Sequence, residues 1–189
     1  LMWLAQIENE EIVLVPMIVQ IVYPRNQTIT NKTTLTLKWA TTNVTSVDHY
    51  EVYVNGSPKD TSIASTQTEY TLTLQEGRNN VTVAAKDMDN NVATSSIYII
   101  IDTTPPTLTV ASPQDNSILN MLTITVEWYG DDVLTQIDHY ELYVDGRQKN
   151  TSIPPTQTTC IINLEEGSHN ITVKAIDKAG NTATSTIQI

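Results

Sequence analysis

Hydrophobic and polar residues alternate along most of the chain in short runs. Leu35, Leu37 and Trp39 are separated by single polar residues, and a second run from Leu122 to Trp128 repeats the pattern. A period of two places every second side chain on the same face of a β-strand. Gly, Pro, Asn and Asp recur between the runs, and no helical period interrupts them. The pattern therefore predicts an all-β chain of short antiparallel strands.

The chain contains an internal repeat. Asp48–Val54 (DHYEVYV) returns 90 positions later as Asp138–Val144 (DHYELYV). Residues 48–99 align without a gap on residues 138–189, with 28 identities in 52 positions. Self-similarity of this length indicates two copies of one structural unit.

The repeat sets the expected domain boundaries. Residues 18–101 form the first repeat and residues 107–189 the second. Residues 102–106 join them, and two adjacent prolines are expected to make this linker short and stiff. Residues 1–17 have no counterpart in the repeat and form an N-terminal extension.

The repeated motif predicts a strand that is buried on one face. Tyr50, Val52 and Val54 are expected to face the core, while Glu51 and Tyr53 point to solvent. Asn-Gly at 55–56 and Asp-Gly at 145–146 directly follow the two copies of this strand. These dipeptides favour a type I′ hairpin turn, because both central residues need a positive φ.

Two groups of motifs resemble a known class of module. Leu-x-Leu-x-Trp followed by Tyr-x-Val-Tyr-Val resembles the second and third strands of fibronectin type III and related Ig-like modules. Residues 166–181 (EGSHNITVKAIDKAGN) and the linker resemble bacterial and archaeal Ig-like repeats. The resemblance implies two tandem antiparallel β-sandwiches, here with an extra N-terminal β-strand. Such modules serve in adhesins, surface layers, filaments and spacers of secreted enzymes, so the resemblance fixes the fold better than the function.

Composition and charge exclude several functions. Ten basic and 21 acidic residues give a net charge of −11, which repels nucleic acid and anionic lipid surfaces. No apolar run is long enough for a membrane span. The chain has no visible signal peptide, although one could have been removed. The single Cys160 forms no internal disulfide, and no phosphate-binding or cofactor motif is present, so we expect no cofactor.

Seven Asn-x-Ser/Thr sequons are present, about twice the number expected by chance from the 15 Asn, 30 Thr and 11 Ser. N-linked glycans are therefore expected partners in a host that attaches them, although Thr-rich strand edges also generate sequons without any role. The sequon asparagines are Asn26, Asn31, Asn43, Asn55, Asn80, Asn150 and Asn170.

Evidence for a metal site or an active site is weak. Asp87, Asp89 and Asn91 have the spacing of a calcium loop, but the following Gly and the distal Glu are missing, so an ordinary hairpin turn is the favoured interpretation. His49 and His139 occupy equivalent positions and lack converging catalytic partners in the sequence. Duplication argues for a role in the fold, and we expect no enzyme activity.

The N-terminal extension is rich in apolar, β-prone residues that need to be covered. One hypothesis is that it is donated as a strand to a neighbouring copy, through Trp3, Leu4, Ile12, Leu14 and Met17. Alternatively, it is the last strand of an earlier repeat, or it folds back on the first repeat.

The function expected from the sequence is that of a structural subunit of an extracellular, cell-surface, pilus-like filament. Copies of the chain would join head to tail, because strand donation is heterologous and does not close. The alternative is an adhesin, a surface-layer segment, or a spacer or binding module of a larger secreted protein. Such a module would bind through the loop at 129–132 or through Tyr53 and Tyr143.

Overall fold

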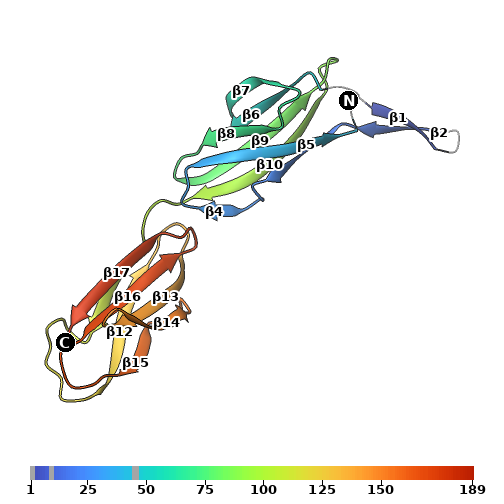
Figure 1. Ribbon diagram of the computed structural model, residues 1–189. Coiled ribbons are helices and arrows are strands. Elements are labelled where there is room, and N and C mark those ends of the chain that lie inside the picture. The colour runs from blue at the N-terminus through green and yellow to red at the C-terminus, as the bar shows by residue number, and fades with distance from the viewer. Residues whose placement is uncertain (1–2, 9–10, 44–46) are drawn as a thin grey trace. The chain divides into compact units, whose positions relative to one another are not determined.

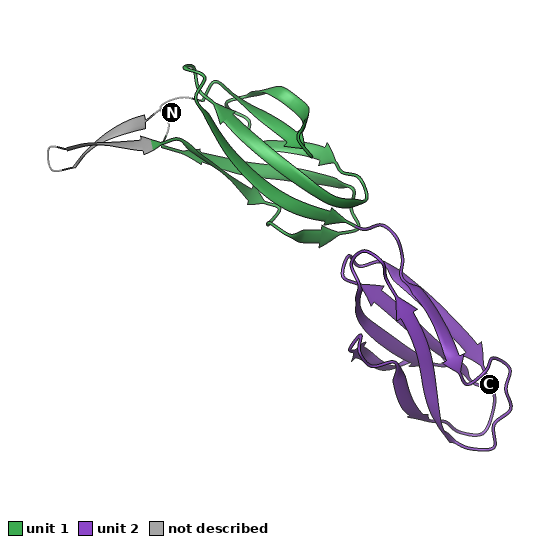
Figure 2. Cartoon of the chain, turned by 180° about the vertical axis from the view of Figure 1, so that it is seen from behind, with its two compact units in different colours: residues 1–101 green, residues 102–189 purple. Residues whose placement is uncertain are grey.

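The computed structural model describes residues 3–8, 11–43 and 47–189, with side chains described for 16–43 and 47–189. All regular structure in these ranges is β, as Figure 1 shows. Within this part of the chain, no helix has the length and hydrophobicity needed to cross a membrane. The chain divides into two compact units, Leu1–Ile101 and Asp102–Ile189 (Figure 2).

Unit 1 is a sandwich of a five-stranded and a three-stranded sheet. The strands of the larger sheet are, in spatial order, β4 (Thr28–Thr30), β10 (Val92–Ile101), β9 (Gly77–Lys86), β6 (His49–Val54) and β7 (Ser57–Ala64). The smaller sheet consists of β3 (Ile18–Tyr23), β5 (Thr34–Thr42) and β8 (Glu69–Thr73). Neighbouring strands are antiparallel, except that β4 pairs parallel with the end of β10.

Unit 2 repeats this sandwich with four and three strands. The first sheet contains β14 (Arg147–Ile153), β13 (Ile137–Val144), β16 (Asn170–Asp177) and β17 (Thr182–Gln188). The second contains β11 (Thr107–Ser112), β12 (Thr123–Asp131) and β15 (Thr159–Asn163). The segment of unit 2 that corresponds to β4 forms no strand. The prediction of two Ig-like β-sandwiches is therefore confirmed, with one edge of unit 2 left shorter.

The N-terminal extension forms two strands, whereas the sequence suggested one. β1 (Trp3–Glu8) and β2 (Glu11–Pro16) pair antiparallel as a sheet of their own, in register from Trp3 opposite Pro16 to Glu8 opposite Glu11. The polar stretch at 8–11 separates two apolar runs. Pairing these runs satisfies backbone groups that one extended strand would leave to water.

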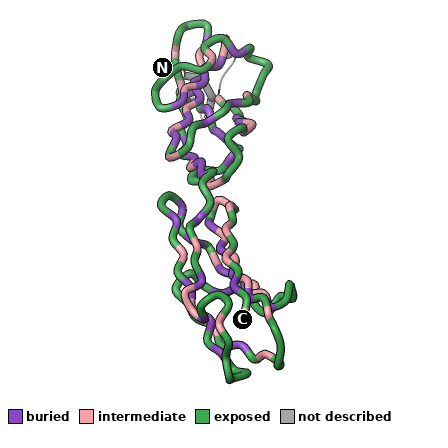
Figure 3. The backbone as a smooth tube through the Cα atoms, turned by 90° about the vertical axis from the view of Figure 1, so that its left-hand side faces the viewer, coloured by how far each residue is buried: buried purple, intermediate pink, exposed green. Residues whose placement is uncertain are grey.

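Each sandwich has its own hydrophobic core, and buried positions alternate with exposed ones along the strands (Figure 3). Each core holds one Trp–Tyr pair in edge-to-face contact. The ring centroids of Trp39 and Tyr50 are 5.2 Å apart, and those of Trp128 and Tyr140 are 5.6 Å apart. This geometry suits the quadrupoles of the two rings.

The strand predicted to be buried on one face is confirmed for its apolar residues. Tyr50, Val52 and Val54 are all buried. Glu51 is a correction, because it is 5% exposed and does not point freely to solvent. The type I′ turns are also confirmed, with φ values of 52° and 78° at residues 55 and 56 and of 50° and 72° at residues 145 and 146.

Pairs of hydroxyl groups join neighbouring strands across the outer faces of the sheets. Thr82 and Ser96 in unit 1 lie 2.8 Å apart, and so do Thr172 and Thr186 in unit 2. Thr36 and Thr71 form a longer pair at 3.4 Å. Cross-strand pairs of this kind stabilise a sheet without placing charge on its surface.

Candidate functional site

A glutamate lies on the outer face of the larger sheet in each unit: Glu51 is buried, and Glu141 is partly buried. In unit 1, Lys86 Nζ donates to Glu51 Oε1 at 2.8 Å, and the Tyr53 hydroxyl donates to Glu51 Oε2 at 2.7 Å. His49 Nε2 lies 3.6 Å from the same carboxylate. Burial raises the pKa of Glu51, but the hydrogen bonds from Lys86 and Tyr53 outweigh it and hold the pKa below its usual value.

Unit 2 contains the same arrangement. Tyr143 donates to Glu141 at 2.8 Å, and Lys174 lies 3.1 Å from Glu141. Burial again raises the pKa of Glu141, and the bonds from Tyr143 and Lys174 lower it to a greater extent. Tyr53 and Tyr143 are only partly exposed and are tied to a carboxylate, so this face is built as a fixed ion-pair network. Its duplication points to maintenance of the fold.

Three aspartates meet at one end of unit 2. Asp102, Asp132 and Asp177 each offer a carboxylate oxygen, and these oxygens lie within 4.8 Å of one another. The three residues are 0%, 8% and 2% exposed. Among the residues that the structure describes, this is the group that could hold a cation, since hard cations such as Ca²⁺ prefer carboxylate oxygens.

Hydrogen bonds account for the positions of these aspartates. Asp102 Oδ2 accepts the Thr135 hydroxyl at 2.6 Å, which joins the start of the unit to the β12–β13 loop. Asp132 Oδ1 accepts three backbone N–H groups of its own loop, from Leu134, Thr135 and Gln136. Asp177 caps the turn after β16. The sequence gives no signal for this cluster, because its members lie far apart along the chain.

The calcium-like segment of unit 1 forms a hydrogen-bonded turn. Asp87 Oδ1 accepts the backbone N–H groups of Asp89 and Asn91, both at 2.9 Å. Asp87 Oδ2 accepts Asn91 Nδ2 at 3.0 Å. Burial raises the pKa of Asp87, but the bonds from Asn91 and Asp89 lower it to a greater extent. The carboxylate therefore already has protein donors on both oxygens.

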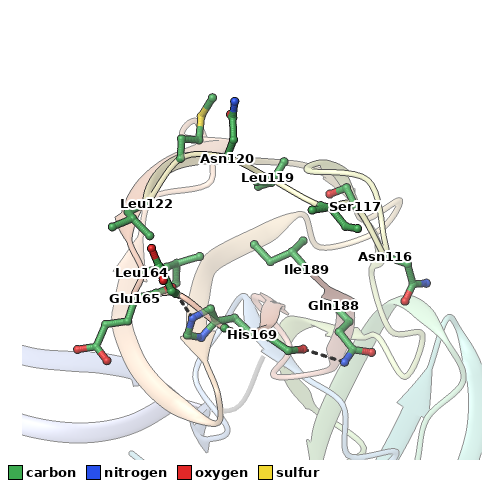
Figure 4. A pocket seen from close by; sticks show the side chains of 15 residues that line it. Asn116, Ser117, Leu119, Asn120, Leu122, Leu164, Glu165, His169, Gln188 and Ile189 are labelled. Carbon is green, nitrogen blue, oxygen red and sulfur yellow. Dashed lines mark hydrogen bonds between the residues drawn. The ribbon is translucent and has the colours of Figure 1, made fainter.

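One pole of unit 2 is open. We call the surface formed by residues 116–122, 164–169 and 188–189 the open pole; it surrounds a cavity of about 770 Å³ (Figure 4). Ile118 is 99% exposed and Leu122 is 51% exposed. Exposed apolar side chains that gather around a cavity mark a surface suited to a partner.

The same place in unit 1 is closed. There, Ile99–Ile101 of β10 pair with Thr28–Thr30 of β4, and Ile101 is fully buried. In unit 2, Ile189 takes the position of Ile99, and residues 117–119, which correspond to β4, form no strand.

A histidine that lies between two hydrogen-bond acceptors borders the open pole. His169 Nδ1 lies 2.7 Å from Asp145 Oδ2, and His169 Nε2 lies 3.0 Å from the Glu165 carbonyl oxygen. Both partners are acceptors, so both bonds form only when the ring is protonated. The bond to Asp145 accordingly raises the pKa of His169, and the same bond lowers the pKa of Asp145.

The structure places the remaining predicted residues as follows. Trp3 and Leu4 belong to β1, and Ile12 and Leu14 belong to β2; their side chains lie outside the described residues. The side chain of Met17, which was also expected to take part in assembly, is 8% exposed and packs in the core of unit 1. In the loop at 129–132, Tyr129 is 61% exposed whereas Asp132 is buried.

The sequons differ in their accessibility. Those at Asn26, Asn31, Asn55, Asn150 and Asn170 begin with an exposed asparagine, and Asn80 is partly buried. The sequon at Asn43 includes residues 44 and 45, which lie outside the described residues.

Together, the two sandwiches define the class of the protein. The chain consists of tandem Ig-like, fibronectin type III-like β-sandwich repeats, a class of modules that is generally non-catalytic. Residues 64–143 match the family model of the bacterial Ig-like domain (group 3), and residues 106–189 match that of glucodextranase, domain B.

The chain is similar to parts of several known proteins. Bacillopeptidase F from Bacillus subtilis (strain 168) is 31% identical over 170 residues, which span 87% of this chain but 11% of that protein. The fibronectin(III)-like modules of Clostridium thermocellum CbhA are similar in structure, with a TM-score of 0.58, 18% identity, and coverage of 91% of this chain and 93% of that one. The FN1–FN3 domains of chicken CNTN1 give a TM-score of 0.47 at 16% identity, covering 92% and 67% of the two chains. At these identities the structural likeness concerns the fold alone.

Proposed function

We propose that the chain is a structural module of an extracellular surface protein and that it joins head to tail with copies of itself. The observation that carries this proposal is the N-terminal hairpin. β1 and β2 pair with each other and share no sheet with the described strands of the sandwich. A two-stranded hairpin is marginally stable alone in water, so it needs a surface to pack on.

The open pole of unit 2 supplies a suitable partner surface. The exposed side chains of Ile118 and Leu122 border its cavity, and the N-terminal segment of a second copy contains β-prone apolar residues at 12–15. Because donor and acceptor lie at different places on the chain, each added copy leaves one donor and one acceptor free. The contact is heterologous, and repeated contacts of this kind build a filament.

Complementation between two variants tests the proposal. A chain that lacks residues 1–15 keeps the acceptor, and an Ile118→Asp, Leu119→Asp chain keeps the donor. We expect each variant alone to be monomeric, an equimolar mixture to form a heterodimer that ends there, and the unaltered chain to form filaments in negative-stain microscopy. If the unaltered chain is monomeric, the proposal is contradicted. Filaments from the truncated chain would show that the hairpin is not the donor.

A second candidate is a spacer module within a larger secreted protein. The observation that favours it is the identity of 31% to a stretch that makes up 11% of Bacillopeptidase F. In that case, the full chain and the chain lacking residues 1–15 would both appear as monodisperse two-lobed particles. The same microscopy therefore distinguishes the two functions.

A further inference from the structure

We propose that Asn150 is the preferred acceptor of an N-linked glycan in the folded protein. An oligosaccharide-transferring enzyme must reach the amide nitrogen of the asparagine and the hydroxyl two residues later. Both groups have to protrude from the protein surface into the active site of that enzyme, so the local backbone conformation decides which sequons can react. The fold sorts the sequons by this criterion.

The sequon at 150–152 lies in a bulge of an edge strand. β14 is the outermost strand of its sheet. Its pairing with β13 runs from Ile153 opposite Tyr140 to Asn150 opposite Leu142, so residues 151 and 152 both face the single residue Glu141. A bulge leaves its extra residue out of the ladder, and on an edge strand no second neighbour holds it.

The side chain of Asn150 is oriented for the reaction. Asn150 Oδ1 accepts the Ser152 N–H at 3.1 Å, and both residues are exposed. The amide nitrogen Nδ2 has no hydrogen-bond partner among the described residues and is free to react. The bond from the Ser152 backbone therefore fixes the side chain of Asn150 without using its Nδ2 atom.

The sequons in central strands lack these properties. Asn80 belongs to β9, which has β10 and β6 on its two sides, and its Oδ1 atom is buried. Thr82, which supplies the hydroxyl group of this sequon, is hydrogen-bonded to Ser96. The sequon at Asn170 enters β16, another central strand, and its Thr172 is bonded to Thr186. Modification of either sequon requires local unfolding of the sheet.

Turn contacts hold two further sequons. Asn55 Nδ2 donates to Asn79 Oδ1 at 3.4 Å, and Asn55 Oδ1 accepts the Asn80 N–H at 2.8 Å. In the sequon at Asn26, the Thr28 hydroxyl donates to the Arg25 carbonyl at 2.8 Å. Asn31 is exposed before β5, but no turn contact orients its side chain in the described structure.

The reaction transfers a sugar chain from a lipid-linked oligosaccharide phosphate. Asn150 Nδ2 attacks the anomeric carbon of the donor sugar, an N-glycosidic bond forms, and the bond between that carbon and the phosphate oxygen breaks. Nδ2 gives up one proton, and the lipid phosphate leaves with the bonding electrons. The proposal presupposes the extracellular route inferred above but does not depend on assembly.

Unit 1 contains a natural control for this geometry. In β7, Asp60 lies opposite Val52 and Ile63 lies opposite Tyr50. Residues 61 and 62 therefore form the same bulge as residues 151 and 152 of β14. Asp60 Oδ1 accepts the Ser62 N–H at 3.0 Å, so the turn is the same with a carboxylate in place of the amide. The substitution Asp60→Asn creates the sequon Asn-Thr-Ser in the geometry of Asn150.

The test uses the folded, unmodified full chain with a purified oligosaccharyltransferase and its lipid-linked donor. Peptides that each carry one sequon give the intrinsic rates, and mass spectrometry of glycopeptides gives the occupancies. We expect Asn150 to react at a rate similar to that of its peptide, and Asn80 and Asn170 to react at least about tenfold more slowly than theirs. Asp60→Asn should add one modification at a peptide-like rate, and Asn150→Asp should remove one.

Two outcomes would overturn the proposal. One is a folded chain in which Asn150 reacts at least about tenfold more slowly than its peptide. The other is equal protection, or equal reactivity, of Asn150 and the two central-strand sequons. Circular dichroism of each variant before the reaction confirms that the fold is retained, so that a failed variant cannot mimic either result.

Discussion

Lys86 and Lys174 hold equivalent glutamates from positions that are not equivalent. In the repeat alignment, Lys86 matches Ile176 and Lys174 matches Ala84. Lys174 lies directly opposite Glu141 in the sheet, whereas Lys86 reaches Glu51 diagonally, because Ala84 is opposite Glu51. Both lysines point outward on their central strand. The sheet thus offers two places from which a lysine can pair with the glutamate at this position.

Exchanging the two lysine positions tests this relationship. Lys86→Ile leaves the buried Glu51 without its cation, and we expect unit 1 to lose about 1–3 kcal/mol of stability. The double variant Ala84→Lys, Lys86→Ile copies the arrangement of unit 2 and should recover most of the loss. Urea unfolding of both variants provides the measurement, and a double variant as unstable as the single one would contradict the prediction.

The same carboxylates predict loss of stability in acid. The folded-state pKa values of Glu51 and Glu141 lie below the usual 4.5. Their contribution is therefore present above the unfolded-state pKa and is lost as the pH falls through the lower, folded-state value. The groups around Glu51 are His49, Tyr53 and Lys86, and the charge of Lys86 favours the charged form of Glu51.

Melting temperatures measured between pH 7 and pH 2 check this dependence. We expect the melting temperature to decrease once the pH is lower than about 4.5, because protonation of these carboxylates then becomes coupled to unfolding. Glu51→Gln with Glu141→Gln should lower stability at pH 7 and flatten the acid branch of the curve. If the acid branch is as steep in this variant as in the unaltered chain, other carboxylates carry the dependence.

Gly130 is required by the ring of Tyr140. A β-carbon at residue 130 would lie 2.7 Å from the Tyr140 phenolic oxygen and 2.9 Å from a ring carbon. Tyr140 is 1% exposed and packs on Trp128, so its ring has little room to move. We expect Gly130→Ala to destabilise unit 2 by about 1–3 kcal/mol.

A double-mutant cycle with Tyr140→Phe identifies the cause of this loss. Removal of the phenolic oxygen should relieve part of the clash, so the two losses should add to more than the loss in the double variant. If chemical unfolding shows that the two losses are strictly additive, the effect of Gly130→Ala comes from the backbone conformation of residue 130 and not from the contact with Tyr140.

Asp132 and its neighbour Asp131 should respond very differently to substitution. Asp132 is buried and accepts three backbone N–H groups, whereas Asp131 is exposed. Asp132→Ala leaves these donors unpaired, at an expected loss of about 1–3 kcal/mol, and Asp131→Ala should change stability by less than about 0.5 kcal/mol. Faster amide hydrogen exchange at Leu134, Thr135 and Gln136 in the first variant would locate the effect. Unchanged exchange there would contradict the assigned role.

The sequence predicted the features that depend on local patterns. Alternation identified the core faces, and Asn-Gly and Asp-Gly identified the hairpin turns, because strand period and turn φ are decided by neighbouring residues. Alternation assigned Glu51 to the outer face but could not show that Tyr53 and Lys86 cover it there. Burial on an outer face depends on side chains from other strands.

Features that depend on distant residues could not be predicted from single motifs. Asp102, Asp132 and Asp177 meet because the fold brings a linker, a loop and a strand end together. The N-terminal hairpin combines two runs that each resemble a strand, and sequence pattern alone does not state their pairing. The open pole is formed by three segments, 116–122, 164–169 and 188–189, that lie far apart in the sequence.

The hydroxyl pairs on the outer faces have one more consequence. Thr172 with Thr186, and Thr82 with Ser96, bind through neutral dipoles at 2.8 Å. Dissolved ions screen charges but leave such short neutral bonds almost unaffected, and hydroxyl groups do not titrate in the physiological range. The contribution of these hydroxyl pairs should therefore be the same in fresh water and in brine.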